Sequence, residues 1–133
     1  MRPIRIVLAD DNPEVLETLA DMLQPEYVIA GSLSDGQSVL QQLATLDPDL
    51  VILDISLPDM TGFDVVRHLK RAGSTVKILF LTVHENIDLV RAAFDLNASG
   101  YVFKSRIASD LVKAIDTICD GGRFSSAEVS LPT

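Results

Sequence analysis

Polar residues capable of phosphoryl chemistry stand directly after short apolar runs of this sequence. They are Asp10, Asp11, Asp54, Thr82 and Lys104. If each apolar run is a buried strand, these side chains meet at one edge of a sheet. Carboxylates crowded together repel one another and lose hydration, which is tolerable where a hard divalent cation shares them. Mg²⁺ takes oxygen ligands, so the pattern predicts a Mg²⁺ pocket with a lysine and a threonine nearby.

The elements that would position these residues alternate in type along the chain. Short β-branched runs alternate with helix-period segments, which indicates βαβ units and a parallel sheet covered on both faces. The last helix is expected to begin near Ser109 and to end at Gly121 and Gly122, since glycine often follows a helix end. An α/β fold of five strands and five helices is predicted. The expected strands are residues 4–9, 27–31, 50–53, 77–81 and 101–103.

The fourth helical segment is apolar or alanine-rich over much of its circumference. It holds Val90, Ala92, Ala93, Phe94 and Leu96. Two interpretations stay open: a second buried face for a partner, or small alanines that let the helix lie close to the sheet.

Composition limits the remaining choices. A chain of 133 residues, 47% of them hydrophobic, predicts one domain, expected over residues 1–124, with 125–133 as the start of a linker or a C-terminal tail. A net charge of −8 argues against binding of nucleic acid or an anionic membrane by this chain itself. Cys119 is the one cysteine, which fits a reducing compartment. With no signal-peptide core and no apolar stretch of about 18 residues, a soluble cytoplasmic protein is expected.

The ordered set of polar residues resembles the receiver domain of bacterial two-component response regulators. Residues 7–12, 51–62 and 100–104 carry the resemblance, which covers nearly all of the chain. Residues 121–125 are similar to the subfamily of transcription factors with a C-terminal helix-turn-helix domain, which is absent here. The resemblance implies a doubly wound, flavodoxin-like fold of strand order 2-1-3-4-5, with its site at the carboxyl ends of the strands.

The resemblance also implies a signalling switch that catalyses only its own phosphorylation and dephosphorylation. Asp54 would accept a phosphoryl group from a sensor histidine kinase, in a phosphorelay, or from a small phosphodonor. Asp11, Asp54 and the backbone carbonyl of Ser56 would ligate Mg²⁺, for which Mn²⁺ can substitute, and Asp10 would hold the ion through water. The negative charge of the phosphoryl group would then bias an element that has two arrangements.

Thr82 and Lys104 would each contact a phosphoryl oxygen. By the same resemblance, Thr82 and Tyr101 form the switch that alters the face of the fourth helix, fifth strand and fifth helix, and so controls transcription. Tyr101 is equally interpretable as a core aromatic. A homodimer on phosphorylation is a further hypothesis, and DNA would be contacted only through the absent domain.

Three residues depart from the usual receiver pattern. Val83 stands where many receivers have alanine or glycine, and its branched side chain would narrow access to Asp54. His84 would affect hydrolysis of the phosphoryl group, although a solvated loop histidine is the simpler interpretation. Ser105 replaces a proline that often forms a cis bond, so that loop is expected to differ.

Three other functions fit the sequence less well than the receiver does. A Mg²⁺-dependent aspartyl-phosphate phosphatase would need a second acid near its nucleophile and a large cap, and neither is found around residues 54–56. In a flavin-binding module, the acids after the first strand would repel the flavin phosphate. A docking module that works without phosphorylation would not need the complete set of site residues.

Overall fold

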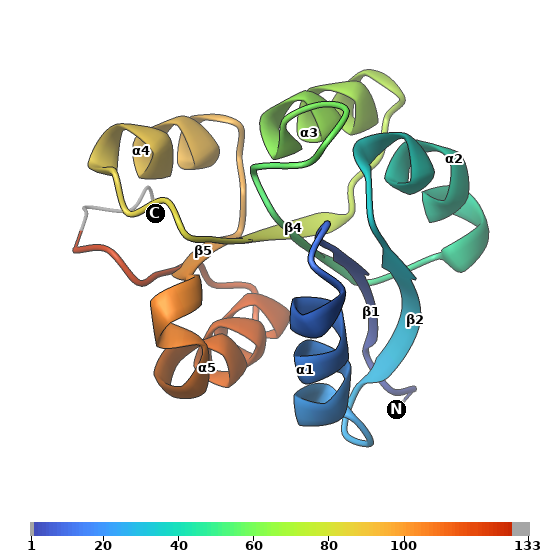
Figure 1. Ribbon diagram of the computed structural model, residues 1–133, viewed down its shortest axis with the longest axis horizontal. Coiled ribbons are helices and arrows are strands. Elements are labelled where there is room, and N and C mark those ends of the chain that lie inside the picture. The colour runs from blue at the N-terminus through green and yellow to red at the C-terminus, as the bar shows by residue number, and fades with distance from the viewer. Residues whose placement is uncertain (1, 129–133) are drawn as a thin grey trace.

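The computed structural model describes residues 2–128, which form a central parallel sheet between two layers of helices (Figure 1). The strands pair in the order β2-β1-β3-β4-β5-β6. Helices α1 and α5 cover one face of the sheet, and α2, α3 and α4 cover the other. The strands are β1 (Arg5–Ala9), β2 (Val28–Leu33), β3 (Leu50–Leu53), β4 (Lys77–Thr82), β5 (Gly100–Phe103) and β6 (Phe124–Ser125). The helices are α1 (Pro13–Leu23), α2 (Gly36–Leu46), α3 (Gly62–Arg71), α4 (Ile87–Asp95) and α5 (Ile107–Cys119), with a 3₁₀ turn at Lys104–Arg106.

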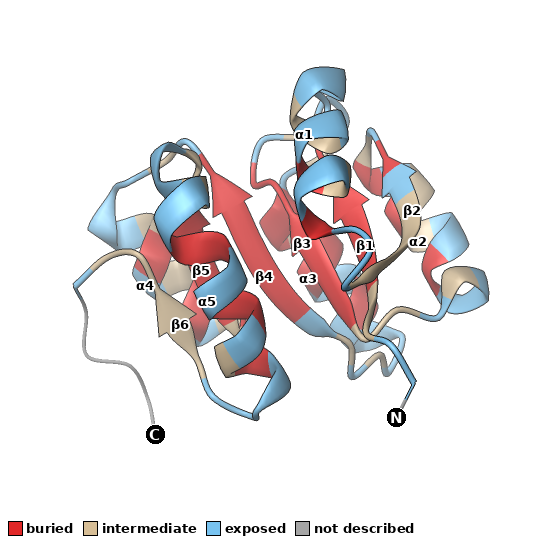
Figure 2. Cartoon of the chain, turned by 90° about the horizontal axis from the view of Figure 1, so that it is seen from below, coloured by how far each residue is buried: buried red, intermediate tan, exposed pale blue. Residues whose placement is uncertain are grey.

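Both faces of the central strands are buried, as Figure 2 shows. Along β1, Ile6 and Leu8 belong to the core under α1 and α5, whereas Val7 and Ala9 belong to the core on the opposite face. Because helices cover both sides, the strands read as continuous apolar runs without polar alternation. The first polar side chains after β1 and β3 therefore stand where those strands end.

The predicted strand order 2-1-3-4-5 and the five helices are confirmed, but the expected number of five strands is wrong. Residues Phe124–Ser125 form a sixth strand that pairs in parallel with Gly100 and Tyr101 of β5. Two residues carry no detectable periodicity, and the open edge of β5, with its unpaired backbone groups, decides this pairing. The expected tail therefore begins inside the sheet. Its last part, 129–133, lies outside the described residues.

Helix α5 begins at Ile107, before the expected start at Ser109, because the 3₁₀ turn Lys104–Arg106 leads directly into it. The last turn of α5 ends near the predicted glycines, and Gly121 has a φ of +91°. A left-handed residue just past a helix end is the usual place for glycine.

One side of α4 packs on the sheet and the other side is exposed. Ala93 is fully buried, while Ile87, Asp88, Arg91 and Asp95 are exposed. The small side chain of Ala93 lets the helix lie close to the sheet, and a partner surface on α4 stays a prediction. None of the helices within residues 2–128 is long and apolar enough to span a membrane.

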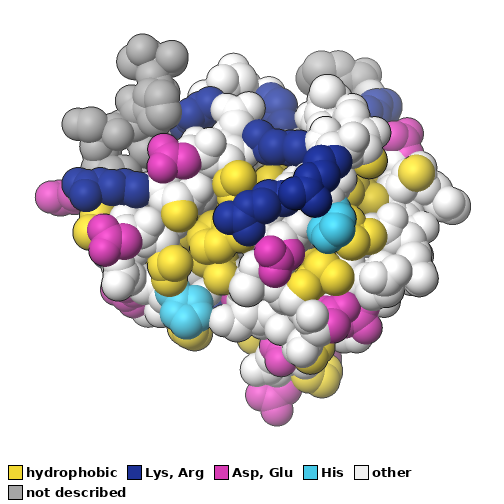
Figure 3. Space-filling model, turned by 90° about the horizontal axis from the view of Figure 1, so that it is seen from above, with side chains coloured by type: hydrophobic (Ala, Val, Ile, Leu, Met, Phe, Trp, Pro, Cys, Tyr) yellow, Lys and Arg dark blue, Asp and Glu magenta, His cyan; other side chains and the backbone are white. Residues whose placement is uncertain are grey.

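The face formed by α2, α3 and α4 carries a stripe of Lys and Arg side chains over α3 (Figure 3). Arg67, Lys70 and Arg71 of α3 are all exposed. Basic groups late in a helix favour its dipole, and Asp64 near the start completes a capping box with Thr61. Stabilisation of α3 is therefore enough to explain the basic stripe, and no ligand needs to be invoked.

Candidate functional site

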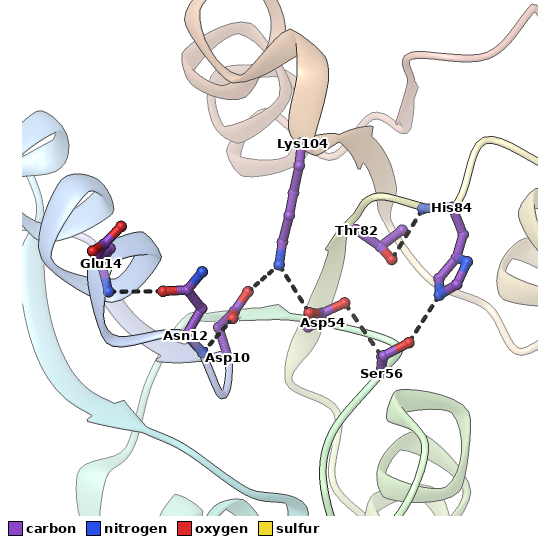
Figure 4. A network of polar contacts seen from close by, with 8 residues as sticks. All are labelled: Asp10, Asn12, Glu14, Asp54, Ser56, Thr82, His84 and Lys104. Atoms are coloured by element: carbon purple, nitrogen blue, oxygen red, sulfur yellow. Dashed lines mark hydrogen bonds and ion pairs between the residues drawn. The ribbon is translucent and has the colours of Figure 1, made fainter.

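The carboxyl ends of β1, β3, β4 and β5 bring the predicted residues together (Figure 4). Asp10 follows β1 and Asp54 follows β3, and these strands are neighbours, with Ala9 paired to Leu53. The Asp54 N–H donates to the carbonyl of Ala9 at 2.9 Å, which fixes the two acidic residues side by side. Asp10 and Asp54 are 3% and 5% exposed, so charged groups are held at the border of the core.

Lys104 lies between these two carboxylates. Its Nζ is 2.7 Å from Asp10 Oδ2 and 2.9 Å from Asp54 Oδ2. Burial alone would lower the pKa of Lys104, but the hydrogen bonds to both carboxylates outweigh it and raise the pKa. Burial raises the pKa of Asp10, and the hydrogen bonds from Lys104 and from the Asn12 N–H offset this only in part. The lysine is therefore firmly charged, while Asp10 remains poorly compensated.

The donor set at this edge fits a divalent cation. Asp10, Asp11 and Asp54 each offer a carboxylate oxygen, and these oxygens lie within 4.8 Å of one another. Three carboxylates face one lysine, which leaves an excess of negative charge in a partly buried place. Hard cations such as Mg²⁺ take oxygen ligands of this kind and retain several waters, and the exposed side of Asp11 leaves room for them.

The absence of a side chain at Gly62 allows the start of α3 to lie close to the backbone of Asp54. A Cβ atom on Gly62, the first residue of α3, would lie 2.4 Å from the carbonyl oxygen of Asp54 and 3.1 Å from Ile55 Cα. The Gly62 N–H donates to the carbonyl of Ile55 at 2.7 Å. The loop after β3 thus folds back on itself and holds the backbone of Asp54 in place.

Thr82 and Tyr101 meet at the loop after β4. Thr82 is fully buried, and its Oγ1 accepts the N–H of His84 at 3.4 Å. Tyr101 is also fully buried, and its hydroxyl donates to the carbonyl of His84 at 2.7 Å. Burial, together with the charge of Asp54, raises the pKa of Tyr101 to about 12. Tyr101 is therefore a core aromatic. Its hydroxyl also holds the loop after β4, which begins directly after Thr82, the other predicted switch residue.

Sequence reasoning missed one contact at the site, between Ser56 and His84. Ser56 Oγ and His84 Nε2 are 2.8 Å apart, so the loops after β3 and β4 are joined across the site. Ser56 also donates its N–H to Asp54 Oδ1, at 3.3 Å. Both residues lie two positions past a site residue on neighbouring strands, and this shared spacing is the signal in the sequence that could have revealed the contact.

Two residues that depart from the usual receiver pattern, Val83 and Ser105, lie in the loops after β4 and β5. Val83 is 64% exposed, and its expected effect on access to Asp54 stays a prediction. The peptide bond from Lys104 to Ser105 is not cis, and the chain turns there into the 3₁₀ segment. The Ser105 hydroxyl donates to Glu85 Oε2 at 3.0 Å. The serine at position 105 thus joins the turn after β5 to the loop after β4 by a hydrogen bond, which a proline side chain could not form.

Residues 6–116 match the family model described as the response regulator receiver domain. The chain is 32% identical over 129 residues to the transcriptional regulatory protein LnrK of Bacillus subtilis, covering 96% of this chain and 59% of LnrK. It is 30% identical over 135 residues to RcsB of Escherichia coli, covering 98% of this chain and 62% of RcsB. The chain therefore spans about three fifths of the length of these curated relatives.

Solved structures show the same fold. The non-phosphorylated receiver domain of RcsB from Escherichia coli superposes with a TM-score of 0.87 at 27% identity, covering 95% of this chain and all of that one. A two-component response regulator of the LuxR family from Aurantimonas superposes with a TM-score of 0.88 at 32% identity, covering 96% and 92%.

Proposed function

The chain belongs to the response regulator receiver domain family, and on this premise we propose that it is a switch that accepts a phosphoryl group on Asp54. Receiver domains are signalling domains of two-component systems and act as regulators rather than as enzymes on a separate substrate. The observation that carries the proposal is the position of Asp54, whose carboxylate is held by Lys104 at 2.9 Å within reach of two further acids.

The chemistry assigned to Asp54 is nucleophilic attack on phosphorus. A carboxylate oxygen forms a bond to phosphorus while the phosphorus–nitrogen bond of a phosphohistidine breaks, and the electron pair stays on the imidazole nitrogen. Such transfers have loose transition states with charge on the equatorial oxygens, so positioning and positive charge supply most of the acceleration. Lys104 supplies part of this charge from a fixed place.

Asp10, Asp11, Asp54 and the carbonyl of Ser56 would hold the metal ion. When bound, Mg²⁺ would neutralise charge on the transferred phosphoryl group. Thr82 would move to donate its hydroxyl to a second phosphoryl oxygen. Its Oγ1 also accepts the His84 N–H, so this movement would act on the loop after β4. Because Tyr101 holds the same loop through the His84 carbonyl, movement of Thr82 would be transmitted to β5.

The partners follow from the same assignment. A sensor histidine kinase would be the phosphodonor, and the face of α4, β5 and α5 would carry the output. One similar structure contains two RcsB dimers bound to two parallel DNAs. We extend this to the present chain as a homodimer formed on phosphorylation, with DNA contacted through further sequence of a longer protein.

Intact mass spectrometry tests the proposal. Wild type, Asp54→Ala and the matched control Asp49→Ala, from the opposite edge of the sheet, are incubated with acetyl phosphate and Mg²⁺, with and without a chelator. One phosphoryl adduct is expected on wild type and Asp49→Ala, and none on Asp54→Ala or with chelator. Absence of an adduct from wild type, even with a panel of sensor kinases, would favour a docking module that works without phosphorylation.

A further inference from the structure

The segment that follows α5 is hydrogen-bonded to β5, the strand that ends immediately before Lys104. The Phe124 N–H donates to the carbonyl of Ser99 at 3.1 Å, and the Ser126 N–H donates to the carbonyl of Tyr101 at 2.8 Å. These bonds continue the sheet beyond β5, and Figure 2 shows β6 at its edge. The segment 124–127 thus lies against the backbone that leads into the phosphoryl site.

Ser126 adds a side-chain bridge at the end of this pairing. Its Oγ accepts the N–H of Phe103 at 3.2 Å and donates to Asp110 Oδ2 at 2.7 Å. The hydroxyl therefore takes the place of a backbone acceptor for the residue immediately before Lys104. It joins that residue to the first turns of α5.

Asp110, which accepts the Ser126 hydroxyl, is buried and has further hydrogen-bond donors. It is 6% exposed, and it also accepts hydrogen bonds from Arg106 Nε at 2.9 Å and from Ser109 Oγ at 3.0 Å. The bond to Arg106, with those from Ser126 and Ser109, holds the pKa of Asp110 below its usual range. A buried carboxylate is costly without hydrogen-bond donors, so loss of one donor should weaken the whole hydrogen-bond network around Asp110.

Residues 103–106 consequently lie between two sets of contacts. On one side, Lys104 reaches Asp10 and Asp54, and on the other side Phe103 and Arg106 are tied to Ser126 and Asp110. The geometry points to Ser126 as a positioning residue for Lys104, so that docking of segment 124–127 on β5 and phosphoryl acceptance at Asp54 are coupled. This inference rests on the proposed function.

Coupling of two sites is reciprocal. Docking of the segment restrains β5 and the turn after it, which lowers the entropy that Lys104 loses when it is fixed on a phosphoryl oxygen. A phosphoryl group that fixes Lys104 should therefore also strengthen docking. The segment that leads out of the receiver would thus be held more firmly in the phosphorylated state.

Three substitutions separate positioning from general damage. Ser126→Ala removes the bridging hydroxyl, and Ser126→Thr retains one. Ser125→Ala is the matched control, because the Ser125 hydroxyl accepts the Ala127 N–H at 3.0 Å within the same segment. With acetyl phosphate and Mg²⁺, Ser126→Ala should form the adduct about fivefold more slowly than wild type, in the range of ordinary coupling between sites. Ser126→Thr should recover most of that rate, and Ser125→Ala should match wild type.

Amide hydrogen exchange tests the reverse direction. Beryllofluoride with Mg²⁺ should slow exchange of the Phe124 and Ser126 amides about fivefold in wild type, and should leave Asp54→Ala unchanged. Two outcomes would overturn this inference but leave the proposed function standing. One is an equal rate of adduct formation in wild type and Ser126→Ala. The other is amide exchange in wild type that beryllofluoride does not change, although the same protein forms the phosphoryl adduct. Failure of wild type to form any adduct would overturn the proposed function and the inference with it.

Discussion

At the amino ends of the strands, Asp49 has a partner for each carboxylate oxygen, whereas at the carboxyl ends three carboxylates cluster around a site where one lysine pairs with two of them. Asp49 Oδ2 accepts the N–H of Arg5 at 2.8 Å, and the guanidinium of Arg2 bonds both oxygens of Asp49. Burial opposes ionisation of Asp49, but these donors lower its pKa overall. The amino edge is balanced and can be explained by folding alone.

The carboxyl edge is not balanced in this way. Burial raises the pKa of Asp10, and Lys104 compensates it only in part. A protein gains no stability from acids crowded at the rim of its core, since buried charges are costly without full pairing. The two edges differ in excess negative charge rather than in the presence of ion pairs, and this excess makes the carboxyl edge the candidate ligand site.

The largest stability effect that would sharpen this comparison is expected for Lys104→Ala. Without the lysine, Asp10 and Asp54 stay buried beside each other, which should cost about 3 kcal/mol in metal-free protein. Urea unfolding with a chelator measures the loss. Arg2→Ala is the control at the amino edge, where an exposed ion pair should be worth at most about 1 kcal/mol. Equal losses in both variants would contradict the contrast between the edges.

The next effect concerns the metal ion. Mg²⁺ at about a hundred times its dissociation constant should stabilise wild type by about 2.7 kcal/mol. Asp11→Asn removes one ligand, and a tenfold weaker affinity would reduce this stabilisation by about 1.4 kcal/mol. Thermal unfolding with and without Mg²⁺ measures both values. Asp49→Asn should respond to Mg²⁺ as wild type does, and an undiminished response in Asp11→Asn would argue against the assigned ligand set.

The smallest effect is the dependence of stability on pH at the amino edge. Because the pKa of Asp49 is lowered in the folded state, its contribution is fully present above its unfolded pKa of about 3.9. The contribution is lost as pH falls through the lowered folded value. Asp49→Asn should cost about 1 kcal/mol at pH 7, a modest value because water screens this group.

In chemical unfolding, the difference between Asp49→Asn and wild type should shrink as pH falls below the unfolded pKa of about 3.9 and disappear once Asp49 is protonated in the folded state as well. A constant difference across the whole pH range would show that the contact is not ionic. Asp10 should contribute the opposite slope in metal-free protein, because a raised folded pKa makes ionisation a cost as pH rises above about 4.

Residue types and their order were enough to predict a parallel sheet covered on both faces and a polar site at its carboxyl edge, whereas the doubly wound strand order was predicted from the family resemblance. Short β-branched apolar runs that alternate with helix-period segments indicate strands buried on both faces, and polar residues at the carboxyl ends of parallel strands then share one edge. Asp10, Asp54, Thr82 and Lys104 could be placed together for this reason.

The contacts that join separate segments depend on how the chain packs and were not predicted. The two residues of β6 have no period of their own, and the free edge of β5 selects them as a strand. The spacing of Ser56 and His84 places them on neighbouring loops, but the path of those loops brings their side chains into contact. The pairing of Ser126 with Asp110 has no such signal in the sequence. Short polar side chains have many partners available in a sequence, and the packed backbone brings only a few of these within hydrogen-bonding distance.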